Sequence, residues 1–327
     1  MRTGAIAIAL MAATPIYAQT PATDVPTTGA PMDDATLPTG MDSASRMTVP
    51  VMVNGQGPFN FVIDTGADRT VVSRELAERL ALPQGGTAKL HAMGGSSDVR
   101  LVKIDRLDVS NRTARHIKAA ALPYRYVGAD GLLGIDSLKG QRIIIDFKAG
   151  TMTLQPSQSP EADMSDGGDV IVVTAKTRLG QLVLVDADAN GQKVWVVVDT
   201  GAQNSVGNTQ LRKLMLARDP RTPITPIEMI DVLGQRTPAD YTIVNKLRIG
   251  GILMGNAAIA FADAHPFKLF ELQKKPSMLL GMESLKSFQR VSVDFAAKKI
   301  KFLLPAGLAP PSDRLAAGDK HAPAGSP

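Results

Sequence analysis

The tetrapeptide Asp-Thr-Gly-Ala occurs twice in the sequence, at residues 64–67 and 199–202, each time at the end of an apolar run with high β propensity. A buried strand has little reason to end in a carboxylate, so two strands that end alike suggest that Asp64 and Asp199 meet. Two carboxylates close together cannot both ionise cheaply, and they therefore share one proton. Such a pair can supply a general base and a general acid to one reaction, and its titration belongs to the pair rather than to either residue.

Each tetrapeptide stands at the same place in a repeated unit of strands and turns. Asn-Gly-Gln at 54–56 and at 190–192 separates β-type runs, and Asn-Gly is a strong hairpin signal because both turn residues accept positive φ. A short helical pattern that begins with a capping residue follows each tetrapeptide: residues 73–82, with Ser73, and residues 208–217, with Asn208.

The repeated unit closes with a second shared motif. Residues 132–147 read LLGIDSLKGQRIIIDF, and residues 279–295 read LLGMESLKSFQRVSVDF. This is an internal duplication of a mainly β unit. Two homologous lobes can pack about a pseudo-two-fold axis, which brings equivalent residues face to face, and the repeated aspartate is the obvious candidate for that position.

On these motifs the sequence resembles the aspartic peptidases of the pepsin and retropepsin clan. It looks like two fused retropepsin-like lobes, similar to the exported bacterial aspartyl proteases with doubled domains. The resemblance implies an all-β fold with short helices, in which two lobes form a bilobal acid-protease architecture. It implies these site residues: catalytic Asp64 and Asp199; supporting Thr65, Gly66, Ala67, Thr200, Gly201 and Ala202; and, behind the loops, Leu133, Gly134, Leu280 and Gly281.

The residue types of the tetrapeptide suit this chemistry. Gly66 and Gly201 let backbone N–H groups turn towards the carboxylates without a Cβ in the way. The resemblance implies that the threonines hydrogen-bond across the axis to the opposite loop. The alanines lack the hydroxyl found there in pepsin-type enzymes, and without that extra donor we expect activity at less acidic pH than in pepsin. The chemistry requires neither a metal ion nor a cofactor.

Two glycine-containing hairpin tips are candidate flaps over the substrate. The first is Met93-Gly94-Gly95, and the equivalent in the second half lies near Leu233-Gly234. Such tips can close over a substrate and exclude water, and retropepsins use one from each subunit. An ordinary surface hairpin is the alternative interpretation for both.

Composition narrows the classes of function. The chain has 327 residues, 44% of them apolar, a formal charge of +5 with Lys and Arg scattered, and no cysteine. Scattered charges do not favour nucleic-acid binding, and the lack of cysteine excludes disulfides, thiol catalysis and cysteine-ligated zinc. The four histidines are dispersed, and a calcium-like loop that starts at Asp186 has Val197 where the last ligand should be, so no metal site is predicted.

The ends and one internal segment indicate the domain organisation. A basic start, a short apolar run and Ile-Tyr-Ala before Gln19 are typical of a cleaved signal peptide, which predicts export to the periplasm or medium without stable membrane insertion. The predicted segments are a signal peptide at 1–18, a disordered leader at 19–45, lobes at 46–155 and 170–304, a linker at 156–169 and a disordered tail at 305–327. The expected protein is a monomer with a pseudo-dimeric site.

The resemblance therefore implies an aspartic endopeptidase that hydrolyses extended polypeptides. Three alternatives stay open: an inactive peptide-binding protein of the same fold, a glycosidase that uses the carboxylate pair, and a zymogen with residues 19–45 as its pro-segment. A glycosidase needs sugar-stacking aromatics, and the aromatic content of 4% argues against it.

Overall fold

The computed structural model of the chain describes residues 5–6, 10–11, 36–42, 44–138, 140–157, 170–178, 181–189, 191–249 and 252–305. Most of the predicted signal peptide, the leader up to residue 35, the linker from residue 158 and nearly all of the predicted tail lie outside these residues.

Most of the first half of the chain forms one sheet. Its strands are β1 (Ala5–Ile6), β4 (Gly40–Met41), β5 (Met47–Val53), β6 (Gln56–Ile63), β7 (Val71–Ser73), β8 (Gln84–His91), β9 (Ser96–Val109), β10 (Arg112–Leu122) and β11 (Gly131–Leu133). Their order in the sheet is β1-β8-β9-β10-β7-β11-β6-β5-β4. Strands far apart in sequence, such as β11 and β6, are therefore neighbours.

The second half repeats this arrangement. Its strands are β15 (Gln181–Ala189), β16 (Gln192–Val198), β17 (Ser205–Gly207), β18 (Thr225–Asp231), β19 (Arg236–Val244), β20 (Leu247–Ile249), β21 (Ile252–Met254), β22 (Ala257–Phe261) and β23 (Ser277–Leu280). From the N-terminal end of the chain, β2 (Leu10–Met11) pairs with β18. The order β18-β19-β22-β17-β23-β16-β15 matches β8-β9-β10-β7-β11-β6-β5 of the first half. The predicted duplication and the all-β, bilobal fold class are confirmed.

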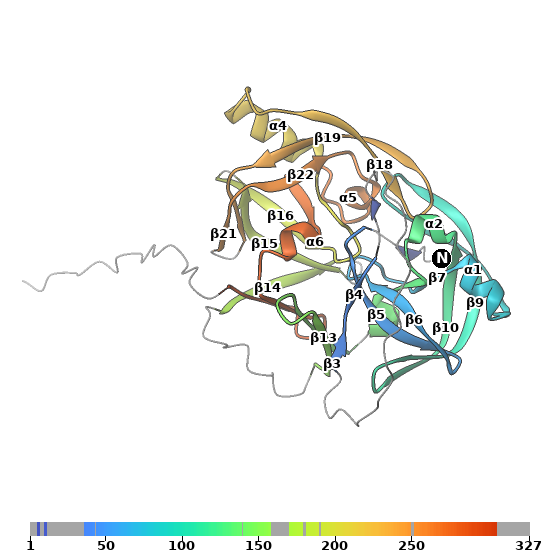
Figure 1. The fold of residues 1–327 in the computed structure, drawn as a ribbon. Coiled ribbons are helices and arrows are strands. Elements are labelled where there is room, and N and C mark those ends of the chain that lie inside the picture. The colour runs from blue at the N-terminus through green and yellow to red at the C-terminus, as the bar shows by residue number, and fades with distance from the viewer. Residues whose placement is uncertain are drawn as a thin grey trace, which may run out of the picture.

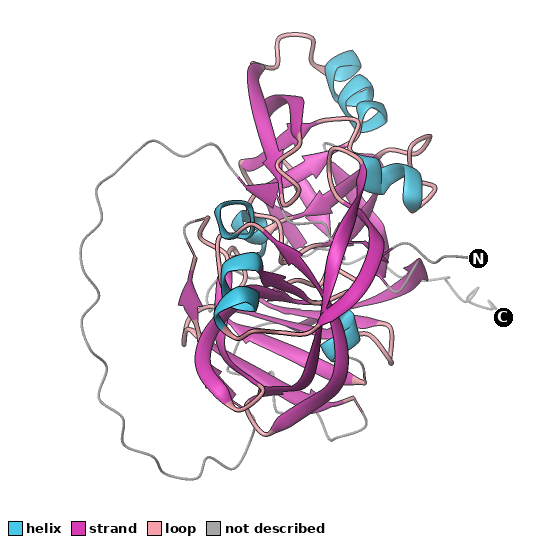
Figure 2. Ribbon diagram, turned by 90° about the vertical axis from the view of Figure 1, so that its right-hand side faces the viewer, coloured by secondary structure: helices cyan, strands magenta, loops and turns pink. Residues whose placement is uncertain are grey.

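A shared sheet joins the two lobes (Figures 1 and 2). It contains β3 (Thr36–Pro38), β12 (Gln141–Asp146), β13 (Thr151–Pro156), β14 (Val170–Arg178), β24 (Arg290–Asp294) and β25 (Lys299–Leu303). Its order is β14-β25-β24-β12-β13-β3, so β12 from one lobe lies against β24 from the other.

The pairing of β12 with β24 shows the pseudo-two-fold axis directly. The strands are antiparallel, with Arg142 opposite Asp294 and Asp146 opposite Arg290. Both pairs are salt-bridged and largely buried, with N···O distances of 3.2 and 2.6 Å. Because Arg142 and Arg290 are equivalent residues of the duplicated motif, the contact is the same one made twice, as in an isologous dimer interface.

Short helices complete each lobe: α1 (Arg74–Arg79), α2 (Tyr124–Val127), α3 (Ile135–Leu138), α4 (Thr209–Arg218), α5 (His265–Leu269) and α6 (Met282–Leu285). The predicted caps are present, because Ser73 accepts from Leu76 N–H and Asn208 accepts from Leu211 N–H. None of the helices in the described part of the chain is long and apolar enough to cross a bilayer.

The first predicted hairpin has the expected turn. Asn54 and Gly55 have φ values of 50° and 77°, and they connect β5 to β6. In the second hairpin Gly191 has a φ of 76°, while Asn190 lies outside the described residues.

One predicted boundary is wrong. The sequence places residues 36–45 in a disordered leader, but β3 pairs with β13 and β4 pairs with β5. β3 has three residues and β4 has two, and neither is long enough to show a periodicity of its own. Both strands form because the neighbouring sheet edges provide their backbone hydrogen-bond partners. The local composition of residues 36–41 does not reveal such partners.

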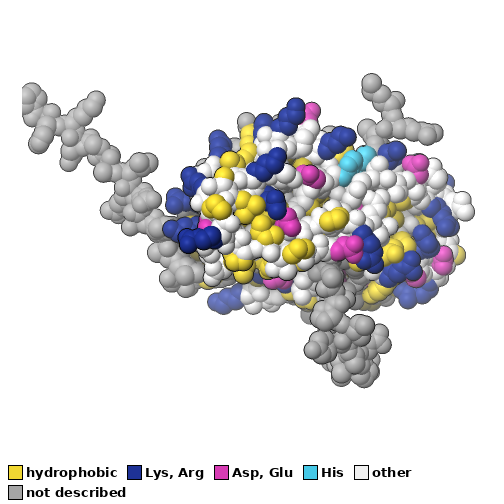
Figure 3. All heavy atoms as spheres, turned by 90° about the horizontal axis from the view of Figure 1, so that it is seen from above, with side chains coloured by type: hydrophobic (Ala, Val, Ile, Leu, Met, Phe, Trp, Pro, Cys, Tyr) yellow, Lys and Arg dark blue, Asp and Glu magenta, His cyan; other side chains and the backbone are white. Residues whose placement is uncertain are grey.

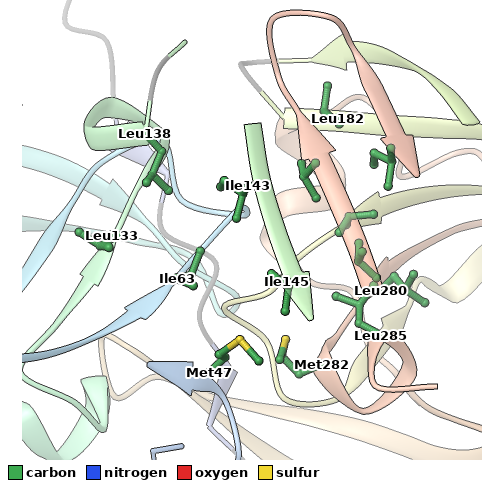
Figure 4. Close-up of a cluster of buried hydrophobic side chains, with 14 of the residues drawn as sticks. Met47, Ile63, Leu133, Leu138, Ile143, Ile145, Leu182, Leu280, Met282 and Leu285 are labelled. Carbon is green, nitrogen blue, oxygen red and sulfur yellow. The ribbon is translucent and has the colours of Figure 1, made fainter. Parts of the chain in front are cut away.

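The hydrophobic core is continuous between the lobes. In Figure 4, side chains from the first half and from the second half lie on either side of β12, which carries Ile143 and Ile145. The surrounding labelled residues are Met47, Ile63, Leu133 and Leu138 on one side and Leu182, Leu280, Met282 and Leu285 on the other. This shared core fixes the relative position of the lobes, and therefore of the two aspartate loops.

Candidate active site

The two Asp-Thr-Gly-Ala loops begin where β6 and β16 end. Each of these strands has a parallel neighbour that ends in Leu-Leu-Gly: Leu133 lies beside Ile63, and Leu280 lies beside Val198. The Asp64 N–H donates to the Leu133 carbonyl and the Asp199 N–H donates to the Leu280 carbonyl, both at 3.0 Å. The Leu-Leu-Gly motifs therefore hold both loops from behind in the same way.

The glycines of these motifs permit that close approach. A Cβ on Gly134 would lie 2.4 Å from the carbonyl carbon of Arg69, and a Cβ on Gly281 would lie 2.5 Å from the carbonyl oxygen of Asn204. Both neighbours are backbone atoms of the loop in front. Any side chain at Gly134 or Gly281 would push that loop out of position.

Reciprocal hydrogen bonds between the threonines tie the loops to each other. Thr65 Oγ1 donates to the Val198 carbonyl at 3.0 Å, and Thr200 Oγ1 donates to the Ile63 carbonyl at 2.6 Å. In return, the Thr65 N–H donates to Thr200 Oγ1 at 3.0 Å and the Thr200 N–H donates to Thr65 Oγ1 at 3.1 Å. All these groups are buried, so the spacing between the loops is tightly constrained.

The aspartates face each other across these bonds. A Cβ on Gly66 would lie 2.5 Å from Asp199 Oδ1, and a Cβ on Gly201 would lie 2.3 Å from Asp64 Oδ1. Each glycine therefore borders the carboxylate of the opposite lobe. The sequence argument explained these glycines by N–H groups that turn towards the carboxylate; the structure adds that the opposing carboxylate leaves no room for a side chain.

Both carboxylates are fully buried and accept hydrogen bonds from their own loops. The Gly66 N–H donates to Asp64 Oδ1 at 2.9 Å, and Asp199 Oδ1 accepts from the N–H groups of Gly201 and Ala202 at 3.0 and 3.2 Å. The Oδ2 atom of each aspartate accepts no hydrogen bond from the described residues. These two oxygens are the ones available to a substrate or a reacting water.

The electrostatic environment affects the pKa values of the two aspartates differently. Burial raises the pKa of Asp64 from 3.8 to about 6, and the positive charge of Arg46 limits the rise. Burial raises the pKa of Asp199 well above 3.8, and the negative charge of Asp64 raises it further. Both carboxyls are therefore biased towards their protonated forms, and the charge of Arg46 opposes this bias most at Asp64.

The aspartyl protease family matches the chain twice, at residues 49–137 and 185–284, which together exceed half of its length. The chain belongs to the aspartyl protease family. No curated protein matches it. The two matched stretches contain one Asp-Thr-Gly-Ala loop and one Leu-Leu-Gly motif each, as expected for a family member with two fused lobes.

The predicted flap tips of this aspartyl protease meet each other. The Gly94 N–H in the first tip donates to Asp231 Oδ2 at 2.9 Å, while Asp231 Oδ1 accepts from the Leu233 N–H in the second tip, also at 2.9 Å. Asp231 is buried, so it joins the tips where solvent does not compete. A Cβ on Gly95 would approach Gln235 of the second tip, and one on Gly234 would lie 2.6 Å from the Tyr126 ring.

Each tip also packs into the opposite lobe. Met93 belongs to a buried cluster that contains Ala202, and Val232, with Leu233 packed beside it, belongs to a cluster that contains Ala67. The His265 N–H donates to the Met93 carbonyl at 2.8 Å. Since Asp64 and Asp199 are fully buried beneath these contacts, the described conformation of this aspartyl protease is closed.

A histidine pair fastens the first flap to the second lobe. His91 Nδ1 and His265 Nε2 are 2.8 Å apart, and the two rings are stacked. Burial lowers the pKa of both imidazoles; the charge of Lys89 adds to this effect at His91, and that of Lys268 adds to it at His265. Each ring is therefore biased towards its neutral form, in which one nitrogen can donate to the other.

Sequence reasoning missed several residues around the site. Asp231 had a usable signal, because an aspartate two residues before Leu233-Gly234 is typical of a turn stabilised by its side chain. The histidine pair had none, because its two rings lie far apart in sequence. The burial of Arg46 had none either, because the two carbonyls that it contacts belong to distant segments, although its third partner, Asp42, is only four residues away. No cluster of three or more potential metal ligands exists among the residues that the structure describes.

Proposed function

We propose that this aspartyl protease is an active endopeptidase in which Asp64 and Asp199 are the catalytic pair. The observation that carries the proposal is the burial of two facing carboxyls, each of which borders the glycine of the opposite loop. Asp64, the ionised member, accepts a proton from a water molecule, and Asp199, the protonated member, donates to the carbonyl oxygen of the scissile peptide bond.

The bonds change in two steps. The water oxygen attacks the carbonyl carbon while one water proton moves to Asp64 and the Asp199 proton moves to the carbonyl oxygen, which gives a neutral tetrahedral diol. Proton transfer from Asp64 to the amide nitrogen then accompanies cleavage of the C–N bond, and a diol proton returns to Asp199. The pair ends in its starting state with an acid and an amine released.

The proposed substrate is an extended polypeptide that pairs with the flap strands. Residues of the chain itself make this kind of contact: β1 is parallel to β8 at Leu90–His91, and β2 is antiparallel to β18 at Ile230–Asp231. Addition of an extended strand to an exposed edge is a general mode of peptide recognition. Because the aspartates are buried in the closed conformation, substrate entry requires the flap contacts to open.

We also propose that residues 1–18 are a cleaved signal peptide, that the protein is exported, and that it acts as a monomer. Charged side chains of both signs are interspersed over the face in Figure 3 and do not gather in one basic patch. This distribution suits a solvated surface around a peptide-binding site. The internal pseudo-two-fold axis already provides both aspartates from one chain.

Incubation of the chain from residue 19 onwards with a peptide library tests the function. Asp64→Asn and Asp199→Asn should each abolish cleavage, while Asp105→Asn, at an exposed position, should cleave like the wild type. The pKa shifts favour activity at less acidic pH than in pepsin-type enzymes. A folded protein that binds peptides without cleaving them would support the inactive alternative, and loss of cleavage in only one asparagine variant would refute the shared-proton mechanism.

A further inference from the structure

Arg46 is fully buried between the lobes, at a position outside both stretches that match the family. Its guanidinium donates to the Gly201 carbonyl at 3.2 Å, to the Val127 carbonyl, and to Asp42 Oδ2 at 2.7 Å from Nε. The Asp42 side chain is 1% exposed. Arg46 therefore connects the loop of Asp199, in the second lobe, with α2 in the first.

The local chain geometry holds this ion pair in place. Asp42 Oδ1 accepts from the N–H groups of Ala44 and Arg46 at 3.0 and 2.7 Å, so the carboxylate also closes a turn. A buried guanidinium is tolerated only when it is paired and hydrogen-bonded. These hydrogen bonds fix the position of the Arg46 guanidinium relative to the aspartate pair.

Arg46 lies close to the pair through Gly201. The Gly201 carbonyl accepts the Arg46 bond, and a Cβ on the same residue would lie 2.3 Å from Asp64 Oδ1. One glycine thus separates the guanidinium from the Asp64 carboxyl. The same glycine belongs to the loop of Asp199, so Arg46 contacts the backbone of one aspartate loop and neighbours the carboxylate of the other.

The equivalent position in the second lobe carries an uncharged residue. Thr48 pairs with Val62, and Val183 pairs with Val197. Val62 stands two residues before Asp64, and Val197 stands two residues before Asp199. Counting back two residues from Thr48 and from Val183 places Gln181 at the position equivalent to Arg46. The positive charge therefore breaks the symmetry of an otherwise duplicated site.

We propose that Arg46 is a positioning residue that anchors the Asp199 loop and directs the negative charge of the aspartate pair to Asp64. This inference rests on the proposed function of the pair. In support, Arg46 is the largest influence that lowers the pKa of Asp64 and the smallest of those that lower the pKa of Asp199. Charged and titratable side chains on the elements around this segment include Asp42, Asp68, Glu75, Tyr124, Arg125, Asp130, Glu283 and Lys286.

Three variants test the proposal. Arg46→Gln gives the first lobe the residue of the second and removes the charge, Arg46→Lys keeps the charge, and Asp42→Asn removes the partner that offsets it. Two readouts are needed: the pH dependence of kcat/KM, and the titration of the Asp64 and Asp199 carboxyl carbons followed by NMR. The second readout does not depend on catalysis, so it separates a failure of this proposal from a failure of the proposed function.

Arg46→Gln should raise both carboxyl titrations, Asp64 more than Asp199, by about one pH unit or more. Asp42→Asn should move them in the opposite direction. Arg46→Lys should titrate like the wild type but lower kcat several-fold, because one ammonium group cannot reproduce the fork of bonds to two carbonyls and a carboxylate. Unchanged titrations in Arg46→Gln, or shifts of the same sign in Arg46→Gln and Asp42→Asn, would overturn the proposal. If Arg46→Gln does not fold, the titrations of Arg46→Lys and Asp42→Asn decide. Titrations of Asp64 and Asp199 in Asp42→Asn that match the wild type would then overturn the proposal.

Discussion

Asp64 and Asp199 are buried in surroundings that disfavour the ionised form of either carboxyl. The pKa of Asp64 is about 6 in the folded protein and 3.8 in the unfolded chain. Between these values the folded state binds more protons at Asp64 than the unfolded state does. The contribution of Asp64 to the free energy of unfolding therefore falls as pH rises from about 4 to about 6 and does not change further above that range. The burial of this carboxyl therefore lowers stability at neutral pH.

Replacement of Asp64 by asparagine should remove this penalty. At pH 7.5 we expect Asp64→Asn to raise the free energy of unfolding by on the order of 2–3 kcal/mol, and at pH 3.5 the gain should largely disappear. Urea unfolding of both proteins at the two pH values measures it. Equal differences at both pH values would contradict the raised pKa.

At Gly201, the carboxyl group of Asp64 lies so close to the backbone that there is no room for a side chain. A Cβ there would lie between 2.2 and 2.4 Å from three atoms of the Asp64 carboxyl group. Gly201→Ala should therefore separate the loops and reduce kcat at least 100-fold, on the order of the loss from a misplaced catalytic group. Gly255→Ala is the matched control, since its nearest neighbour would be 3.9 Å away and kcat should be unchanged. Wild-type kcat in Gly201→Ala would show that the loops can adjust.

At the scale of elements, the predicted flap hairpins are joined to each other and to the opposite lobes, and we expect one of these contacts to respond to pH. The bond between His91 and His265 requires one neutral acceptor nitrogen, and the nearby charges of Lys89 and Lys268 oppose protonation. A lowered folded pKa means that the contact is fully formed above about pH 6.5 and weakens as pH falls below that value. Acidification should therefore favour flap opening.

Hydrogen exchange at the Gly94 amide, which bonds to Asp231, reports this opening. Its protection, corrected for the intrinsic pH dependence of exchange, should fall between pH 7 and pH 5 in the wild type. In His265→Phe, which keeps an aromatic ring but cannot titrate, the fall in protection over that range should be clearly smaller. The same pH dependence in both proteins would mean that another group controls the flap.

At the scale of the whole molecule, the lobes are joined by a core and by two equivalent ion pairs. Arg142–Asp294 and Arg290–Asp146 are largely buried on either side of the pseudo-two-fold axis. The two ion pairs fix the register of β12 against β24, because any sliding of one strand along the other would break both pairs at once. This register helps to hold the two aspartate loops opposite each other.

Removal of one partner should be strongly destabilising. Asp294→Ala removes the buried carboxylate that pairs with the Arg142 guanidinium, and we expect the free energy of unfolding to fall by about 3–5 kcal/mol. Glu228→Ala, which removes an exposed ion pair with Arg236, is the control and should change it by less than about 1 kcal/mol. Thermal or urea unfolding distinguishes the two outcomes. Similar small losses in both variants would mean that the hydrophobic core alone joins the lobes.

The parts of the fold that could be predicted are those encoded by neighbouring residues. The Asn54-Gly55 turn and the caps at Ser73 and Asn208 depend on a few consecutive positions, and the structure has each of them. The repeated motifs carried long-range information as well, because a duplication implies an axis. Helix ends were less certain: the pattern at 73–82 corresponds to a helix at Arg74–Arg79.

The sequence by itself determined the fold class, the family and the pair of aspartates that the structure brings together, because each copy of the motif served as a reference for the other. Only the tertiary structure revealed what is not duplicated: the strands at 36–41, the bond from Asp231 to Gly94, and Arg46 beneath the Asp199 loop. Arg46 and Gly201 are 155 positions apart, and Gly94 and Asp231 are 137 apart. Contacts of this kind arise from how two folded lobes close on each other, and no periodicity or local pattern records them.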